Sequence, residues 1–516
     1  MRIALITIAA LLAACSAPEA EGDAAAHQTD DGDDLGTVDL RTSCDADVAD
    51  ELNRAVALLH HMMYEQARPS FQEVAEEDEA CAMAHWGIAM TSFQPLWNPT
   101  SDEDLDRARA ALDAARSIGA ETDREAMYID AVEAFFTDPE PPAEDRASDH
   151  TARIQQWNEA QRELHEAYPD DVDAAAFLGL SEVALAMTEF SPEEEHDYSR
   201  ETAAGELLEG YLDDHPEHPG LFHYIIHAYD SPALAHRARE VAEGYDALAP
   251  ETTHALHMPS HIFVRLGRWE ETAEWNKRSA EAALVVAEED AHGIMHHVHA
   301  LDYMMYGYLQ LGDEESAREV LDRLQEVDQV WPELGFTYGL AAAPARYHLE
   351  RGDWEQAAQL EPMGPEDVDW DAHPAAAALT SYARGLGAAR TGDLEQAREE
   401  RAEIEAFVEA LRDDGDAYWA YMTEALGQAV EAWIIYEEGE TDQALALMSE
   451  AADLEDSMDK HPITPGEVFP VRELYGELLL EEGRTDEALA AFEASLERTP
   501  NRRNALAGMD RASAGR

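Results

Sequence analysis

The sequence is short of positive charge. Its 516 residues include 35 Lys and Arg against 111 Asp and Glu, which gives a formal net charge of −76. A surface this acidic repels phosphate backbones and anionic membrane surfaces, so we expect no nucleic acid partner. The acidic residues are spread along the whole chain, which favours adaptation to high salt over a local acidic binding tail.

Long apolar runs are also missing, although apolar residues are not. Hydrophobic residues make up 45% of the chain, enough for a folded core, so wholesale disorder is excluded. The length exceeds the roughly 250–300 residues at which single cores stop growing. The composition therefore predicts several domains or a modular array.

The N-terminus carries an apolar stretch that is too short to span a bilayer. Arg2 precedes the apolar run 3–14, which predicts a signal peptide over residues 1–14. The run LAAC at 12–15 resembles the bacterial lipobox, in which the cysteine is lipidated, and Ser16 follows it. The resemblance implies an outer-membrane lipoprotein that faces the periplasm or the cell surface. Its contact with the membrane would be the lipid on Cys15.

Cysteine is scarce, with three in the chain. With Cys15 assigned to lipidation, Cys44 and Cys81 remain, and an oxidising compartment favours a disulfide between them. A disulfide that closes the loop between Cys44 and Cys81 would stabilise the folded protein by about 3–4 kcal/mol. Residues 15–45 are rich in Ala, Asp, Glu and Gly, which predicts a disordered tether.

Beyond the tether, the chain is dominated by residues that favour helices, and apolar positions recur every three or four residues. Six times, a glycine that suits a helix C-terminus is followed five residues later by a small residue inside the next helix. A small residue at that position lets two antiparallel helices approach closely. The pairs are Gly267/Thr272, Gly312/Ala317, Gly352/Ala357, Gly392/Ala397, Gly439/Ala444 and Gly483/Ala488.

The last unit, LYGELLLEEGRTDEALAAFEASLERTP at 474–500, resembles the tetratricopeptide repeat. Segments such as CAMAHWGIAM, HYIIHAYD and HALHMPSHIFVRLGRW are similar to those of bacterial tetratricopeptide-repeat lipoproteins. The resemblance implies an all-α, superhelical stack of antiparallel helix pairs. We expect helical repeats over 46–205, His-rich repeats over 206–328 and C-terminal repeats over 329–516.

Histidines gather in two neighbouring repeats. His223 and His227 are spaced i, i+4, as are His257 and His261, and both pairs are offset by 34 residues (257 − 223 and 261 − 227). Equivalent points of stacked repeats lie side by side, so the four imidazoles should form one patch. Aligning Gly267 with Gly312, 45 residues on, adds further members at groove-facing positions: His254, His299, Asp302 and Tyr306, with His296 and His297 one turn earlier.

Imidazole pairs at i, i+4 present two nitrogens to one ion, so this pattern indicates a transition-metal site for Zn, Cu or Fe. The predicted ligands are His223, His227, His254, His257, His261, His299 and Asp302. Calcium and magnesium prefer oxygen ligands and fit poorly. Two other interpretations stay open: a polar groove for an anionic peptide or small carboxylate, and histidines that only pack or form hydrogen bonds.

Two functions follow from these patterns. The first is an interaction scaffold that holds a protein, a peptide or a small ligand in its concave groove, with a metal site in that groove. The alternative is a metal-dependent enzyme with an open coordination position near His257 and Asp302. The chain lacks the glutamate of the His-Glu-x-x-His motif, so no general base of a zinc peptidase stands at the expected place. Whether the protein is an enzyme stays open.

Overall fold

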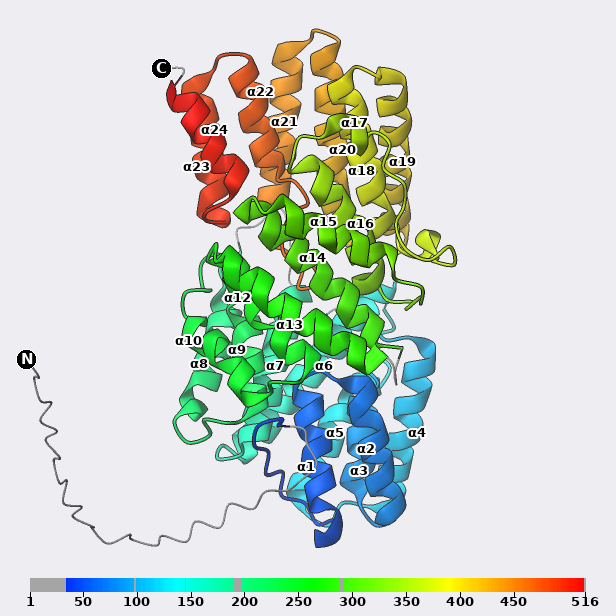
Figure 1. Ribbon diagram of the computed structural model, residues 1–516. Helices are drawn as coiled ribbons and strands as arrows, with labels where there is room; N and C mark the ends of the chain where they lie inside the picture. The colour runs from blue at the N-terminus through cyan, green and yellow to red at the C-terminus, as the bar shows by residue number, and fades with distance from the viewer. Residues whose placement is uncertain (1–33, 97–98, 144, 189–195, 288–290, 515–516) are drawn as a thin grey trace, which may run out of the picture. The chain divides into compact units, whose positions relative to one another are not determined.

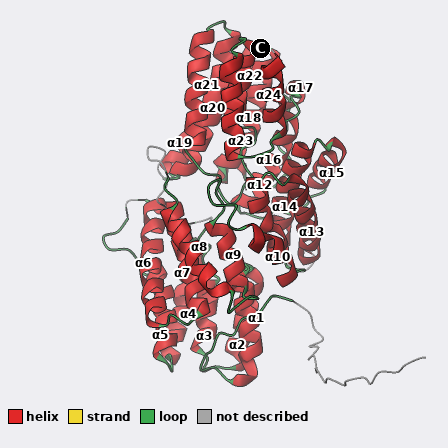
Figure 2. Ribbon diagram, turned by 90° about the vertical axis from the view of Figure 1, so that its left-hand side faces the viewer, coloured by secondary structure: helices red, strands yellow, loops and turns green. Residues whose placement is uncertain are grey.

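The computed structural model describes residues 34–96, 99–143, 145–188, 196–287 and 291–514. The expected signal peptide, Cys15 and most of the expected tether lie outside these residues. The described residues form helices and loops and contain no β-strand (Figure 2). None of the helices in these ranges combines the length and the apolar character that crossing a membrane requires.

The helices are numbered in chain order. The N-terminal helices are η1 (Ala46–Val48), α1 (Ala49–His60), α2 (Tyr64–Glu77), α3 (Ala82–Met90), α4 (Asp102–Ile118), α5 (Asp123–Phe136), α6 (Arg146–Ala167), α7 (Val172–Thr188) and α8 (Ser199–Leu212). The central helices are α9 (Pro219–Ala228), α10 (Arg239–Leu248), α11 (Thr253–His257), α12 (Pro259–Arg265), α13 (Trp269–Ala287), α14 (Gly293–Leu311), α15 (Glu314–Gln325) and α16 (Leu334–Leu349). The C-terminal helices are α17 (Trp354–Ala357), η2 (Trp370–Ala372), α18 (Pro374–Thr391), α19 (Leu394–Asp413), α20 (Ala417–Glu437), α21 (Thr441–Asp456), α22 (Val471–Glu481), α23 (Thr485–Arg498) and α24 (Arg503–Ala514).

Consecutive helices pack as antiparallel pairs, and the pairs stack. For example, α18 packs on α19, α20 on α21 and α22 on α23, each pair joined by a short turn (Figure 1). The first helices of successive units also pack on one another in the order α14, α16, α18, α20, α22 and α24. The expected all-α stack of antiparallel helix pairs is therefore confirmed.

The six predicted glycine turns are confirmed. Each glycine has a positive φ, from 63° at Gly267 to 93° at Gly439, which is the left-handed conformation that side chains disfavour. All six small partner residues are fully buried. The repeat signal in the sequence thus located both the turns and the closest approach of the paired helices.

A disulfide joins Cys44, just before η1, to Cys81, just before α3. Nearby, Glu125 of α5 accepts hydrogen bonds from the backbone N–H and the hydroxyl of Ser43 at 2.6 and 2.8 Å. These contacts fix the start of the described chain against the first helix pairs.

Residues 457–470 join α21 to α22 and lie across the histidine-bearing helices; we call them the covering segment. The Tyr303 hydroxyl of α14 donates to the Thr464 carbonyl oxygen at 3.0 Å. Arg346 of α16 donates to the carbonyl oxygen of Gly466 at 3.2 Å. The groove positions predicted to face a ligand are therefore buried, because the chain fills this part of the groove with its own loop.

Gly387 of α18 offers a test of the close helix packing. A Cβ at this position would lie 2.4 Å from the backbone nitrogen of Ala358 and 2.6 Å from the carbonyl oxygen of Trp354. We expect Gly387→Ala to lower the free energy of unfolding by about 1–3 kcal/mol, because backbone atoms must shift. Gly210→Ala in α8 is the control, since no heavy atom lies within 4 Å of its Cβ. Gly210→Ala should raise the free energy of unfolding by up to about 1 kcal/mol.

Urea unfolding of both variants measures the two effects. Equal effects of the two substitutions would contradict close packing at Gly387.

Candidate metal centre

Six of the predicted histidines form two groups of three. His223 and His227 of α9 join His254 of α11 in the first triad, and in each triad the candidate ligand atoms lie within 4.8 Å of one another. The second triad consists of His257 of α11, His261 of α12 and His299 of α14. The predicted clustering is confirmed, but as two triads and not as one four-histidine patch.

The close contacts that the rings make inside the triads join Nε2 atoms. In the second triad, His257 Nε2 lies 3.0 Å from the Nε2 atoms of both His261 and His299. In the first triad, the Nε2 atoms of His223 and His227 are 3.1 Å apart. Two nitrogens bound to one ion at 2.0–2.1 Å would be separated by roughly 2.9 Å in an octahedron and roughly 3.3 Å in a tetrahedron. The observed separations fall between these two values.

The opposite nitrogens of the same rings face hydrogen-bond acceptors. His223 Nδ1 donates to the His60 carbonyl oxygen at 2.7 Å, and His257 Nδ1 to Asn276 Oδ1 at 2.6 Å. Asn276 is itself oriented by donating its Nδ2 to the Thr272 carbonyl oxygen at 2.7 Å. A proton held on Nδ1 leaves Nε2 of a neutral ring with a lone pair, which is the state in which a histidine binds a metal.

Asp230, in the loop after α9, orients the third of these rings. Its Oδ2 accepts from His261 Nδ1 at 2.8 Å and from Lys460 Nζ of the covering segment at 2.6 Å. Its Oδ1 accepts from Arg265 Nε at 3.0 Å. Burial alone would raise the pKa of Asp230, but the charges of Lys460 and Arg265 and the hydrogen bond from His261 hold it well below its ordinary value. Asp230 is therefore an ionised acceptor.

Burial keeps the imidazoles neutral. It lowers the pKa of His223 to about 3 and that of His299 to about 3, and in both cases the positive charge of neighbouring groups acts in the same direction. The pKa of His257 is well below 6.5, first through burial and then through the proximity of His299 and His261. The rings can accept a metal ion without first losing a proton at neutral pH.

Asp302, which the sequence placed among the ligands, belongs to neither triad. Its Oδ1 lies 3.4 Å from Arg346 Nε, and its buried Oδ2 has no hydrogen-bond partner among the described residues. The register explains the difference. Residues 42 apart meet across α11–α12 and α14, as His257 and His299 do. Aligning the glycines had assumed an offset of 45, but α11 and α12 are separate helices that meet at Pro259, whereas α14 is continuous.

The remaining histidines of the cluster lie at its edge. His296 has ring contacts with His254 at 5.7 Å and with His292 at 4.6 Å between centroids. His297 donates its Nδ1 proton to the Ala280 carbonyl oxygen at 2.8 Å and so faces away. The expected extension of the cluster thus holds for His296 alone.

A third polar group was missed at the sequence level. His60 Nε2 and His218 Nε2 lie 2.9 and 3.2 Å from the same oxygen, Oδ1 of the buried Asp173. The three residues come from α1, the start of α7 and the residue before α9, so no spacing in the sequence relates them. The doublet His60–His61 was the available signal, but alone it does not identify its partners.

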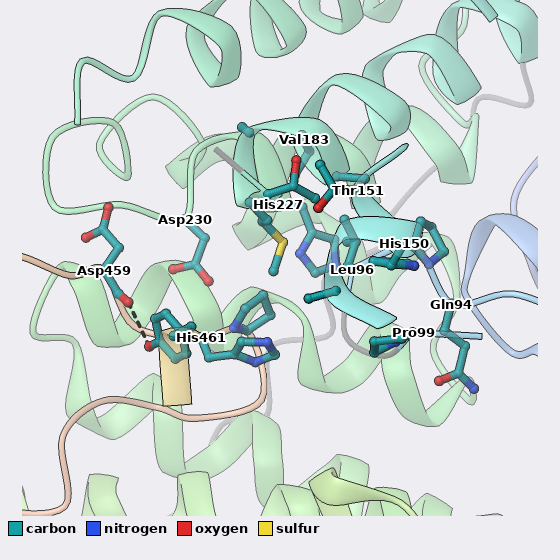
Figure 3. Close-up of a pocket in the computed structure, with 18 of the residues that line it drawn as sticks. Gln94, Leu96, Pro99, His150, Thr151, Val183, His227, Asp230, Asp459 and His461 are labelled. Atoms are coloured by element: carbon teal, nitrogen blue, oxygen red, sulfur yellow. Dashed lines mark hydrogen bonds between the residues drawn. The ribbon is translucent and has the colours of Figure 1, made fainter. Parts of the chain in front are cut away.

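A large cavity of about 2090 Å³ borders the first triad at His227. Figure 3 shows His227 and Asp230 near Asp459 and His461 of the covering segment, with His150 and Leu96 also lining the cavity. The cavity brings solvent to one ring of the first triad.

No protein-family model matches the chain, and no curated protein matches it. Similar solved structures include the APC/C hetero-tetramer Cut9–Hcn1, at 11% identity over 90% of this chain and 96% of that chain, with a TM-score of 0.32. The P58(IPK) TPR domain is 11% identical over 91% and 98% of the two chains, with a TM-score of 0.19. The human IFIT1 dimer with PPP-AAAA is 13% identical over 80% and 96%, with a TM-score of 0.28. With TM-scores this low, the fold assignment rests on the helix pairs themselves.

The lowered histidine pKa values predict an acid-sensitive metal-free protein. An unfolded histidine titrates near 6.5, so between about pH 6.5 and pH 3 the unfolded chain binds more protons than the folded one. The free energy of unfolding is therefore highest above about pH 6.5 and falls as the pH drops, by up to about 1.4 kcal/mol per pH unit for each such group.

Urea unfolding with a chelator at a series of pH values measures this slope. His299→Gln should reduce the slope, and His236→Gln, at an exposed position, should leave it unchanged. A slope that is the same in all three proteins would contradict the prediction.

Proposed function

We propose that this protein binds transition-metal ions through the two histidine triads. The observation that carries the proposal is the pair His257 and His261. The Nδ1 atoms of both rings donate to fixed acceptors, Asn276 and Asp230, so their Nε2 lone pairs face each other at 3.0 Å. Two facing lone pairs repel, and a cation bound to both removes the repulsion.

The neighbouring hydroxyl of Tyr303 does not remove this repulsion. The Tyr303 oxygen lies 3.4 Å from His261 Nε2, but its proton is directed to the Thr464 carbonyl oxygen at 3.0 Å. Protonating His257 is also unfavourable, because burial and the adjacent rings lower its pKa well below 6.5. A metal ion bound to both Nε2 atoms would satisfy them together.

The ligand set favours zinc, copper or iron. Three imidazoles suit these ions, whereas calcium and magnesium prefer oxygen ligands. A three-histidine site leaves a fourth tetrahedral position for water or another ligand. This open position supports the alternative function, a metal-dependent enzyme with His257 among its ligands. Asp302 belongs to neither triad and lies against Arg346.

The helical-repeat fold also supports an interaction scaffold. The cavity beside His227 combines apolar residues with paired charges, which suits a protein segment, a peptide or a small ligand. Export as an outer-membrane lipoprotein, with Cys15 lipidated, is part of the same proposal and rests on the residues of the N-terminus. Globomycin, which inhibits lipoprotein signal peptidase, should cause the precursor to accumulate in a bacterial host, and Cys15→Ser should abolish lipid labelling.

Metal analysis of protein purified without a His-tag tests the central proposal. Wild-type protein should retain zinc, copper or iron in at least stoichiometric amount after dialysis. His257→Gln should lose the metal of the second triad, because both of its Nε2 contacts are removed. His236→Gln is the matched control at an exposed position and should retain the wild-type amount. Wild-type protein that binds only traces of metal after reconstitution would refute the proposal.

Asn276 tests whether the proton on His257 Nδ1 matters. We expect Asn276→Ala to weaken metal binding by about 10–100-fold, because the ring loses the acceptor that fixes its orientation and proton. Asn504→Ala is the control, because it removes hydrogen bonds to the carbonyl and carboxylate oxygens of Glu350, a residue of neither triad. Competition with a chromophoric chelator measures both affinities, and equal affinities would show that Asn276 does not position the ligand.

A further inference from the structure

We infer that the two triads hold their ions as a pair, which binds one small anion as a bridging ligand. The inference rests on the proposed function and goes beyond it in stoichiometry, in the separation of the ions and in the class of ligand. It predicts a binuclear centre with all-histidine protein ligands and a third, exchangeable ligand supplied by the solution.

The triads touch each other through two ring contacts. His227 and His261 lie 5.7 Å apart between centroids, and His254 and His257 lie 5.9 Å apart. The second contact lies within α11, whose five residues supply one ligand to each triad. The two ions would therefore be bound by rings that contact one another, the kind of proximity that a two-metal site requires.

No carboxylate belongs to either triad among the residues that the structure describes. Six neutral imidazoles leave the charge of two divalent ions uncompensated inside a buried cluster. Asp230 is an ionised acid that contacts the cluster, and it is already shared by His261, Arg265 and Lys460. A bound hydroxide or another small anion would supply the missing negative charge and complete the coordination of both ions.

Solvent reaches rings of both triads. His227, His254 and His299 are 7–9% exposed, whereas His223, His257 and His261 are at most 2% exposed. His227 borders the large cavity together with Asp230 (Figure 3). The partly exposed rings come from both triads, so a small anion can reach each of them.

Copper(II) titration of the metal-free protein, followed by electron paramagnetic resonance, tests the pairing. We expect two equivalents to bind and the integrated signal at two equivalents to fall clearly below the amount of bound copper, because the spins couple. His254→Gln and His299→Gln each remove one ligand from a different triad. Each variant should bind one equivalent strongly, with a full, isolated signal, and His236→Gln should behave like the wild type.

Azide, a small anion with a copper charge-transfer band, tests the bridging ligand. Titration of the two-copper protein should saturate at one azide per two coppers, and the single-triad variants should lose this tight binding at least tenfold. Two azides per chain would overturn the bridging ligand, and a full signal from two bound coppers would overturn the pair.

Binding of one equivalent by the wild type would also overturn the pair while leaving the proposed metal binding intact. Binding of none would refute both. Circular dichroism identifies variants that fail to fold; in that case the wild-type signal and azide stoichiometry decide.

Discussion

The buried carboxylate of Asp230 connects the parts of this protein on which the candidate site depends. It accepts hydrogen bonds from His261 and Arg265 of α12 and from Lys460 of the covering segment. A buried carboxylate costs several kcal/mol unless it is paired. Its three cationic or N–H partners therefore fix one arrangement, in which the loop from the C-terminal repeats lies over the histidines.

The pKa of Lys460 reflects opposing effects of burial and of the charges around it. Its pKa is lowered to about 8, first by burial and also by the charge of Arg265, against the opposing effect of Asp230. Arg346 and Arg502 extend the same principle along α14. Arg346 donates to the Gly466 carbonyl oxygen, and Arg502 donates to the Tyr306 hydroxyl at 2.6 Å. The interior between the repeats is thus polar, and hydrogen bonds connect its elements. These bonds hold the surroundings of the histidines in place.

The fold was largely predictable because its signals are local. A glycine after a helix and a small residue five positions later are determined by backbone sterics and close helix packing, and all six pairs have these roles. The pair of His223 and His227 followed from helix geometry in the same way, because both lie in α9, whereas His257 and His261 lie on either side of the break at Pro259. The third member of each triad was harder to predict, because His254 and His299 reach their triads from other helices.

The contacts between repeats at the site depend on how far neighbouring helices are shifted along each other and on the course of the loops. A single sequence gives little information about either. The alignment of glycines placed Asp302 opposite His257, but the break at Pro259 puts His299 there. Asn276 and Asp230, which accept the ring protons, and Lys460, which donates to Asp230, come from three separate elements.

By itself, the sequence determined an all-helical stack and the clustering of histidines in its central repeats, because both follow from periodicity along the chain. Only the tertiary structure decided that the rings form two triads under the covering segment, with their Nε2 atoms together. The physical reason is that ring orientation depends on hydrogen bonds to the other nitrogen. Those acceptors lie far away in sequence and meet the rings only when the repeats are packed.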